Sequence, residues 1–300
     1  MAVTVSVRER NADGKGSGRP RGRAGWRRFR ANGVAVVSAV FLLLMYAVAA
    51  TGPAISPYSP NAVDIANTNA PPSPAHWLGT DESGRDVLAR VIAGARTSMT
   101  VGLIAMVLAI AIGALVGSLA GYLGGWVDTV LMRFTDGMLA IPYFFLVLIV
   151  VAVFGSRFWN IVGSIGLISW MVVARIVRGE VLRYRGLDFV LAAQGLGATS
   201  ARILGRHIIP QTVPSLIVAA TFGVANAILL ESALSYLGLG IQPPQASWGN
   251  MLSNAQAYVW ENPLLPIYPG LLIVCTVLAY NFLGDALRDA LDPRYRESDV

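Results

Sequence analysis

The fold of this chain is decided by one patterned loop between two long apolar segments. It runs from Gly186 to Gln211 and reads Gly-Leu-Asp-Phe-Val-Leu-Ala-Ala-Gln-Gly-Leu-Gly-Ala-Thr-Ser-Ala-Arg-Ile-Leu-Gly-Arg-His-Ile-Ile-Pro-Gln. Asp188 can cap a first short helix, and Gly197 suits the left-handed conformation of the residue that follows a helix end. Thr199 or the next residue can cap a second short helix, which Pro210 should stop. The pattern therefore predicts a helix-turn-helix between two membrane spans.

The second short helix is amphipathic. One of its sides consists of residues at helical spacing: Ile203, Leu204, His207 and Ile208. Arg202 and Arg206 fall on another side. In the first helix, Ala192 and Ala193 leave a low surface that another backbone could approach. These residues alone leave two interpretations open: a hairpin that rests on lipid headgroups, or a contact with another protein.

Composition places the chain in the membrane. Its 300 residues are 55% hydrophobic and only 13% charged, whereas soluble domains carry about 25% charged residues. The mean hydropathy is +0.58. Residues 1–30 hold nine basic and two acidic side chains and are expected to be a disordered arm. A topology signal or contact with anionic lipid explains such an arm better than nucleic-acid binding does.

Hydropathy predicts an all-α, polytopic membrane protein with six transmembrane helices. The expected spans are residues 33–50, 101–122, 137–154, 158–174, 214–235 and 265–283. In the second span, Gly113, Gly117 and Gly121 recur every four residues and should let a neighbouring helix approach closely. Pro142 should kink the third span. The single cysteine, Cys275, lies in an apolar run and excludes a disulfide framework and a CxxC metal site.

Charge placement predicts the orientation of the spans. If residues 1–30 are cytoplasmic, six spans place the 175–213 segment and the C-terminus in the cytoplasm as well. Only four of the 23 Lys and Arg residues then lie outside: Arg85, Arg90, Arg96 and Arg157. This distribution agrees with the positive-inside rule.

Polar motifs concentrate on the expected outer side. Residues 52–99 are rich in proline and end in an amphipathic helix. A metal site of His76, Asp81 and Asp86 is disfavoured because the three do not share one helical face. In the fifth span, Asn226 and Glu231 are candidates for a translocation path or outer gate, since polar groups in spans usually face a cavity or a partner.

Three motifs resemble one known family. The loop is similar to the EAA loop of ABC importer permeases. Its matching positions are Ala192, Ala193, Gly197, Ile208 and Pro210, whereas Leu191 stands where the family has Glu. Two further motifs resemble the second permease of bacterial dipeptide, oligopeptide and nickel importers. The first is Gly79–Asp86, with Gly94, Arg96 and Ser98 after it. The second consists of the paired segments Ser235–Gly240 and Asn281–Pro293, with Pro243-Pro244 and Trp248-Gly249.

This resemblance implies a type I ABC importer permease (MetI-like) fold in the bacterial cell membrane, with both termini cytoplasmic. The implied partners are a sister permease in a heterodimer, two cytoplasmic ABC ATPases and an extracytoplasmic substrate-binding protein. The subunit itself would be no enzyme and would hold no cofactor, because ATP and Mg²⁺ belong to the ATPases. Consistently, no Gly-x-x-x-x-Gly-Lys pattern is present. Nucleic acid is not among the implied partners.

The resemblance also assigns roles to residues. The ATPase-coupling set is Asp188, Ala192, Ala193, Gly197, Arg202, Arg206 and Pro210. A separate hypothesis rests on the position of the polar motifs on one side of the membrane: the residues expected to face the binding protein are Asp81, Arg85, Asp86, Gln242 and Trp248. Helix capping is the competing role for the polar members of this second set.

Four segments follow from this interpretation. They are a basic arm (1–32), a first span with its outer loop (33–99), the transport core (100–293) with its coupling loop (183–213), and a short tail (294–300). Peptides are the expected substrates, and nickel or haem-like cargo remains an alternative. An ion-coupled secondary transporter is disfavoured, because no charged residue lies near the midplane of a span. An intramembrane enzyme is disfavoured too, because both histidines lie outside the spans.

Overall fold

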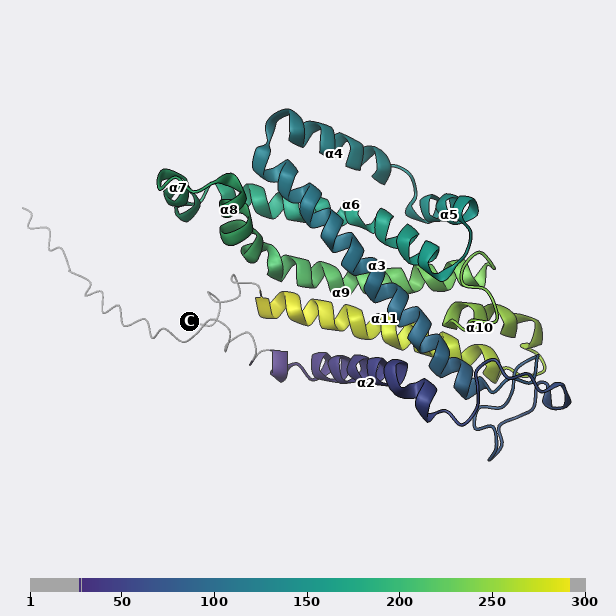
Figure 1. Cartoon of the computed structure of the whole chain (residues 1–300). Coiled ribbons are helices and arrows are strands. Elements are labelled where there is room, and N and C mark those ends of the chain that lie inside the picture. Colours follow the sequence, from purple (N-terminus) through teal and green to yellow (C-terminus); the bar gives the residue numbers. More distant parts are fainter. Residues whose placement is uncertain (1–26, 28, 292–300) are drawn as a thin grey trace, which may run out of the picture.

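The computed structural model describes residue 27 and residues 29–291, so nearly all of the expected basic arm and the tail after residue 293 lie outside the described part. Five helices in this part are long and apolar enough to cross a membrane. They are α2 (Gly33–Ile55), α3 (Val87–Leu123), α6 (Phe158–Arg185), α9 (Ile209–Tyr236) and α11 (Leu264–Leu291). Figure 1 shows them side by side in one bundle. The all-α membrane fold is confirmed.

The two ends of the bundle differ. One end carries a helical loop (residues 186–208) with α7 (Asp188–Gly195), α8 (Ser200–Ile203) and a π-helical segment, η2 (Leu204–Ile208). The opposite end carries a cap (residues 56–86 and 237–263) that includes η1 (Ile65–Asn67), α10 (Trp248–Ala255) and η3 (Gln256–Tyr258). In Figure 1 the start of α2 and the end of α11 lie at the same end as the helical loop. The relative placement therefore matches the expected topology.

The third expected span is not one straight helix. The chain forms α4 (Gly125–Leu139) and α5 (Tyr143–Phe154), which are bent by 86° at the break between them. Pro142 lacks a backbone N–H and disfavours helical geometry in the residue before it. The 12 residues of α5 span about 18 Å, well short of the ~30 Å hydrocarbon core. The two helices meet the length and composition of a membrane span only together, as one broken span or a re-entrant loop, and the kink expected at Pro142 is a full break.

The glycine stripe of α3 packs against α6, as predicted. A Cβ on Gly113 would lie 2.6 Å from the Cβ of Val173, and one on Gly121 would lie 2.9 Å from the Cβ of Val181. A Cβ on Gly117, which lies between these two glycines, would press against the backbone of α6. No side chain fits in these positions without moving α6. The missing side chains thus set the spacing of the two helices.

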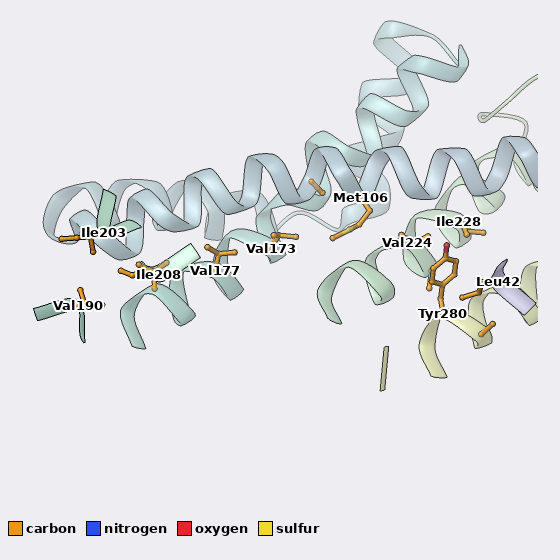
Figure 2. Packing of buried hydrophobic residues seen from close by; sticks show 14 residues of the cluster. Leu42, Met106, Val173, Val177, Val190, Ile203, Ile208, Val224, Ile228 and Tyr280 are labelled. Carbon is orange, nitrogen blue, oxygen red and sulfur yellow. The ribbon is translucent and has the colours of Figure 1, made fainter. Parts of the chain in front are cut away.

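One apolar cluster connects the helical loop with the bundle. Figure 2 shows it running from Val190, Ile203 and Ile208 in the loop to Val224 and Tyr280 in α9 and α11. The three loop residues are at most 1% exposed. Because their side chains are embedded among those of the spans, the loop is part of the folded core.

Candidate functional site

The helical loop adopts the predicted helix-turn-helix. Gly197 has a φ of +78°, and its N–H donates to Gln194 O at 2.9 Å. Ala198 N–H donates to Ala193 O at 3.0 Å, which completes a Schellman motif at the end of α7. The Oγ1 atom of Thr199 accepts Arg202 N–H at 3.4 Å and caps α8. The left-handed glycine and the Thr199 cap are confirmed.

Two local predictions in this loop are wrong. The N-cap of α7 is Leu187, and Asp188 is the first helical residue with no capping hydrogen bond from its side chain. Its charge still lies in the first turn, where the helix dipole favours an anion. Pro210 does not stop a helix either, because residues 200–236 form one helical rod of 37 residues. Pro210 has no N–H to donate and its ring crowds the preceding turn, and the wider π-helical turn of η2 directly before it accommodates both.

The outward surface of the loop is apolar with a basic flank. Val190 is buried, and on the opposite side of α7 Ala192 is exposed between larger apolar side chains. The exposed fractions are 42% for Phe189, 51% for Leu191 and 89% for Leu196. Arg202 and Arg206 are also exposed, whereas Ala193 is half-buried against the core cluster. Of the expected coupling residues, Ala192, Arg202 and Arg206 are thus free to meet a partner, and Ala193 and Gly197 shape the surface.

A contact that sequence reasoning missed holds the loop at its base. Ser215 Oγ in α9 donates to Glu180 Oε1 in α6 at 2.7 Å. The two residues lie within about two helical turns of the loop, one in each flanking helix, so this hydrogen bond joins its two arms. A polar residue on each flank was the only sequence signal, because nothing local indicates that the two side chains meet.

Two arginines of α6 hold α3 and α4 in place beside the loop. Arg178 of α6 binds Asp128 of α4 through two hydrogen bonds, Nε to Oδ1 at 2.5 Å and Nη2 to Oδ2 at 2.6 Å. Arg185 Nη1 donates to Gly121 O at the end of α3 at 2.9 Å. Two-point binding of this kind fixes orientation as well as distance. The ends of α3, α4 and α6 therefore form one frame from which the loop projects.

Asn226 lies on the exposed side of α9. Leu229, about one turn further along the same side, is exposed as well, at 44%. An amide in the middle of an apolar span requires a polar partner or water. Its place in a translocation path remains a prediction, with an exposure that suits the role.

Glu231 differs from Asn226. Its side chain is 0% exposed and binds hydroxyl groups of Ser98 and Ser235. It therefore does not line an open path in this structure, which corrects the expectation that it faces a cavity or a separate partner. Its contact with Ser98 bridges residues 133 positions apart, and a single sequence carries no signal for such a pairing.

The polar motif at the start of α3 is also buried. Asp81, Arg85 and Asp86 are between 4% and 7% exposed. Arg85 Nε donates to Asp81 Oδ2 at 2.7 Å, and Asp86 Oδ1 accepts Ala89 N–H at 2.7 Å as the N-cap of α3. This corrects the expectation that these side chains form an exposed outer face. Their hydrogen bonds favour the competing role, helix capping and loop support.

The rest of the predicted outer face divides in two. Trp248 is 0% exposed and its indole N–H donates to Val91 O at 3.2 Å, whereas Gln242 is exposed. His76 hydrogen-bonds Asp86 through Nδ1 at 2.8 Å. Among the described residues, no group of three or more His, Cys, Asp or Glu side chains could hold a metal ion. Sequence reasoning missed a contact of Arg90 in α3, which is 1% exposed and forms an ion pair with Asp81 of the cap.

Comparison with known proteins identifies the architecture. The family model "Binding-protein-dependent transport system inner membrane component" matches residues 109–297. The model "N-terminal TM domain of oligopeptide transport permease C" matches residues 21–72. A chain of the MetNI methionine ABC transporter, solved in inward-facing conformations, superposes with a TM-score of 0.56 over 68% of this chain and 97% of its own length, at 18% identity. That likeness confirms the MetI-like fold.

Relatives match almost the whole chain. A putative peptide permease protein of Brucella suis biovar 1 is 43% identical over 269 residues, which are 89% of each chain. The glutathione transport system permease protein GsiD of Shigella flexneri serotype 5b is 44% identical over 272 residues, or 90% of each chain. GsiD of Escherichia coli O6:K15:H31 is 43% identical over the same length. Because the first family model covers well over half of the residues of this chain, the chain belongs to the family of inner membrane components of binding-protein-dependent transport systems.

Proposed function

We propose that this chain is a transmembrane permease subunit of an ATP-driven ABC importer for di- or oligopeptides. It would translocate substrate that an extracytoplasmic binding protein delivers, by alternating access. Family membership supports transport, and relatives named for peptide and for glutathione, itself a tripeptide, support this substrate class.

The observation that carries the proposal is the helical loop. Its Phe189, Leu191 and Leu196 expose large apolar side chains at the tip of a rigid projection, while Val190 and Ile203 anchor that projection in the core. A protruding element that is firmly tied to two spans can transmit a push or pull into them. We assign its outward surface as the docking site of a cytoplasmic ATPase subunit.

Orientation and assembly follow from this assignment. The loop end of the bundle would be cytoplasmic together with both termini, which agrees with the excess of arginine there. The exposed Asn226 side of α9 would face the path shared with a sister permease. When ATP closes the two ATPases, the loops of the two permeases would approach each other, and α6 and α9 would tilt with them because Glu180 and Ser215 join their ends.

The test is reconstitution of the full complex in liposomes. A cysteine introduced by Gly195→Cys, where an added side chain meets open space, should cross-link to the ATPase in a chain whose Cys275 is replaced by alanine. Loaded binding protein should stimulate ATP hydrolysis and drive uptake of a labelled tripeptide. If the loop forms no cross-link and hydrolysis stays unstimulated, the assignment is refuted. Uptake of a nickel chelate without uptake of peptides would refute the substrate class alone.

A further inference from the structure

Glu231 is the centre of a buried hydrogen-bond cluster at the cap end of α9. Its Oε2 atom accepts a hydrogen bond from Ser98 Oγ of α3 at 2.9 Å, and its Oε1 atom accepts one from Ser235 Oγ at 2.7 Å. The side chain is 0% exposed, as is that of Ser98, and Ser235 is 1% exposed. One carboxylate therefore joins α3 to α9 away from solvent.

Each of the two serines passes the contact on to the backbone of the cap. Ser98 Oγ accepts Trp248 N–H at 3.3 Å, and Ser235 Oγ accepts Ile241 N–H at 3.0 Å. A hydroxyl group has one proton and two lone pairs. Each serine thus donates its proton to Glu231 and uses a lone pair for a backbone amide. Two parallel chains of hydrogen bonds lead from one carboxylate to the two ends of residues 241–248.

The segment held in this way has a fixed shape of its own. Asn250 Nδ2 donates to Ile241 O at 3.1 Å and to Gln245 O at 2.7 Å. Asn250 and Ser247 also form a capping box at the start of α10. Gly249 packs so closely on α9 that an added Cβ would lie 2.5 Å from Ser232 O. Residues 237–250 are therefore internally braced, and the Glu231 cluster attaches them to the spans.

The chemistry of the cluster favours a positioning role. No ion pair of the described residues involves Glu231, and both of its carboxyl oxygens accept hydrogen bonds from hydroxyl groups. Burial of a carboxylate without a cation costs stability unless its oxygens receive several hydrogen bonds. An apolar side chain would fill the space at less cost, but it would leave the hydroxyl protons of both serines without their common acceptor. What the carboxylate adds is a fixed geometry between α3, α9 and the 237–250 segment.

We propose that Glu231 is a positioning residue that makes residues 237–250 one rigid unit with α9 and α3, so that a load on this part of the cap is carried along α9 to the helical loop. The inference rests on the proposed function, in which the load is the docked binding protein. The exposed rim of the segment would receive it: Leu237 (55% exposed), Leu239 (41% exposed) and Gln242. The helical rod of residues 200–236 connects the two sites without a break.

Single substitutions test each branch of the cluster. Ser98→Ala removes the acceptor of the Trp248 amide, Ser235→Ala removes that of the Ile241 amide, and Glu231→Gln affects both. Ser118→Ala is the matched control, because Ser118 is also a buried serine of α3 but its Oγ has no hydrogen-bond partner. Hydrogen exchange, followed by mass spectrometry on the assembled complex, should quicken about five-fold or more in residues 238–250 of the three variants, since local opening becomes easier. The control should exchange like the wild type.

The second readout separates positioning from mere structural support. In Glu231→Gln, assembly and basal ATP hydrolysis should be retained, whereas stimulation by binding protein and peptide uptake should fall about ten-fold. Unchanged exchange in all variants, or faster exchange with full stimulation, overturns the proposal. If Glu231→Gln fails to assemble, the two serine variants decide by the same criteria. A wild-type complex that binding protein does not stimulate refutes the proposed function instead, and that result is independent of the variants.

Discussion

The left-handed residue at the end of α7 offers the sharpest test of the helical loop. Gly197 has a φ of +78°, and a Cβ added there would meet nothing within 4 Å. The cost of a side chain at this position is therefore purely one of backbone conformation. Gly195, two residues earlier, also has open space around an added Cβ but lies within α7. The pair separates backbone strain from the mere addition of a side chain.

The expected magnitudes follow from the conformation. A non-glycine residue in the left-handed region costs about 1–2 kcal/mol, less for Asn and more for a β-branched residue. Relief of this strain requires a change in φ, which breaks the Ala198 and Gly197 hydrogen bonds that end α7. A cost of one to two kcal/mol changes a population ratio by roughly 5–30-fold. The native arrangement should therefore decline in the order Gly197→Asn, Gly197→Ala, Gly197→Val.

The assay is co-purification of the ATPase subunits with the permease pair, with substrate-stimulated hydrolysis in liposomes beside it. All variants should insert in the membrane in normal amount, because the spans are untouched. Gly197→Val should lose ATPase association or uncouple hydrolysis from uptake, while Gly195→Val should remain close to the wild type. Equal association for Gly197→Val and Gly195→Val would refute the reasoning, as would a graded series that does not follow the cost of positive φ.

Three further predictions concern packing, docking and orientation. Gly117→Ala should lower the stability of the purified chain by about 1–3 kcal/mol through overpacking against α6, measured by thermal unfolding, whereas Gly179→Ala, with open space around its Cβ, should be neutral or stabilising. Leu196→Ser should weaken ATPase co-purification more at high salt than at low salt, because it removes an apolar contact. In a chain without its native cysteine, Gln245→Cys should react with an impermeant thiol reagent in intact cells and Ser200→Cys only after permeabilisation; labelling in the reverse order would invert the topology.

Local patterns predicted the parts of the fold that depend on neighbours in sequence. Hydropathy located the long helices, the four-residue glycine period located the contact of α3 with α6, and Gly197 with Thr199 gave the turn of the loop. Each of these features is determined within one or two helical turns. The kink expected at Pro142 is a full break of 86°, because proline disfavours helical geometry in the residue before it as well as at its own position.

The cap shows why the remaining sites were misplaced. The polar motifs predicted an outer-face position for Asp81 and Arg85, yet these two residues satisfy each other at a spacing of four residues and bind the loop backbone around them. Glu231 depends on Ser98, which lies 133 positions away in the sequence. Both cases require knowledge of which surfaces the folded chain brings together. The buried positions are nonetheless the ones that give the cap its fixed shape.

The departure at Leu191 determines what can cover the helical loop. Helix α9 alone has 28 residues and is about 42 Å long, which matches a bilayer with its headgroups, at ~40–45 Å. With the cap at one surface, α7 therefore lies at or beyond the opposite headgroups, where acyl chains do not reach. Leu191 and Leu196 are nevertheless more than half exposed there. Under the proposed function, a groove of the ATPase would cover this apolar tip, and leucine in place of glutamate would make the contact apolar at a point where the family pattern supplies a charge.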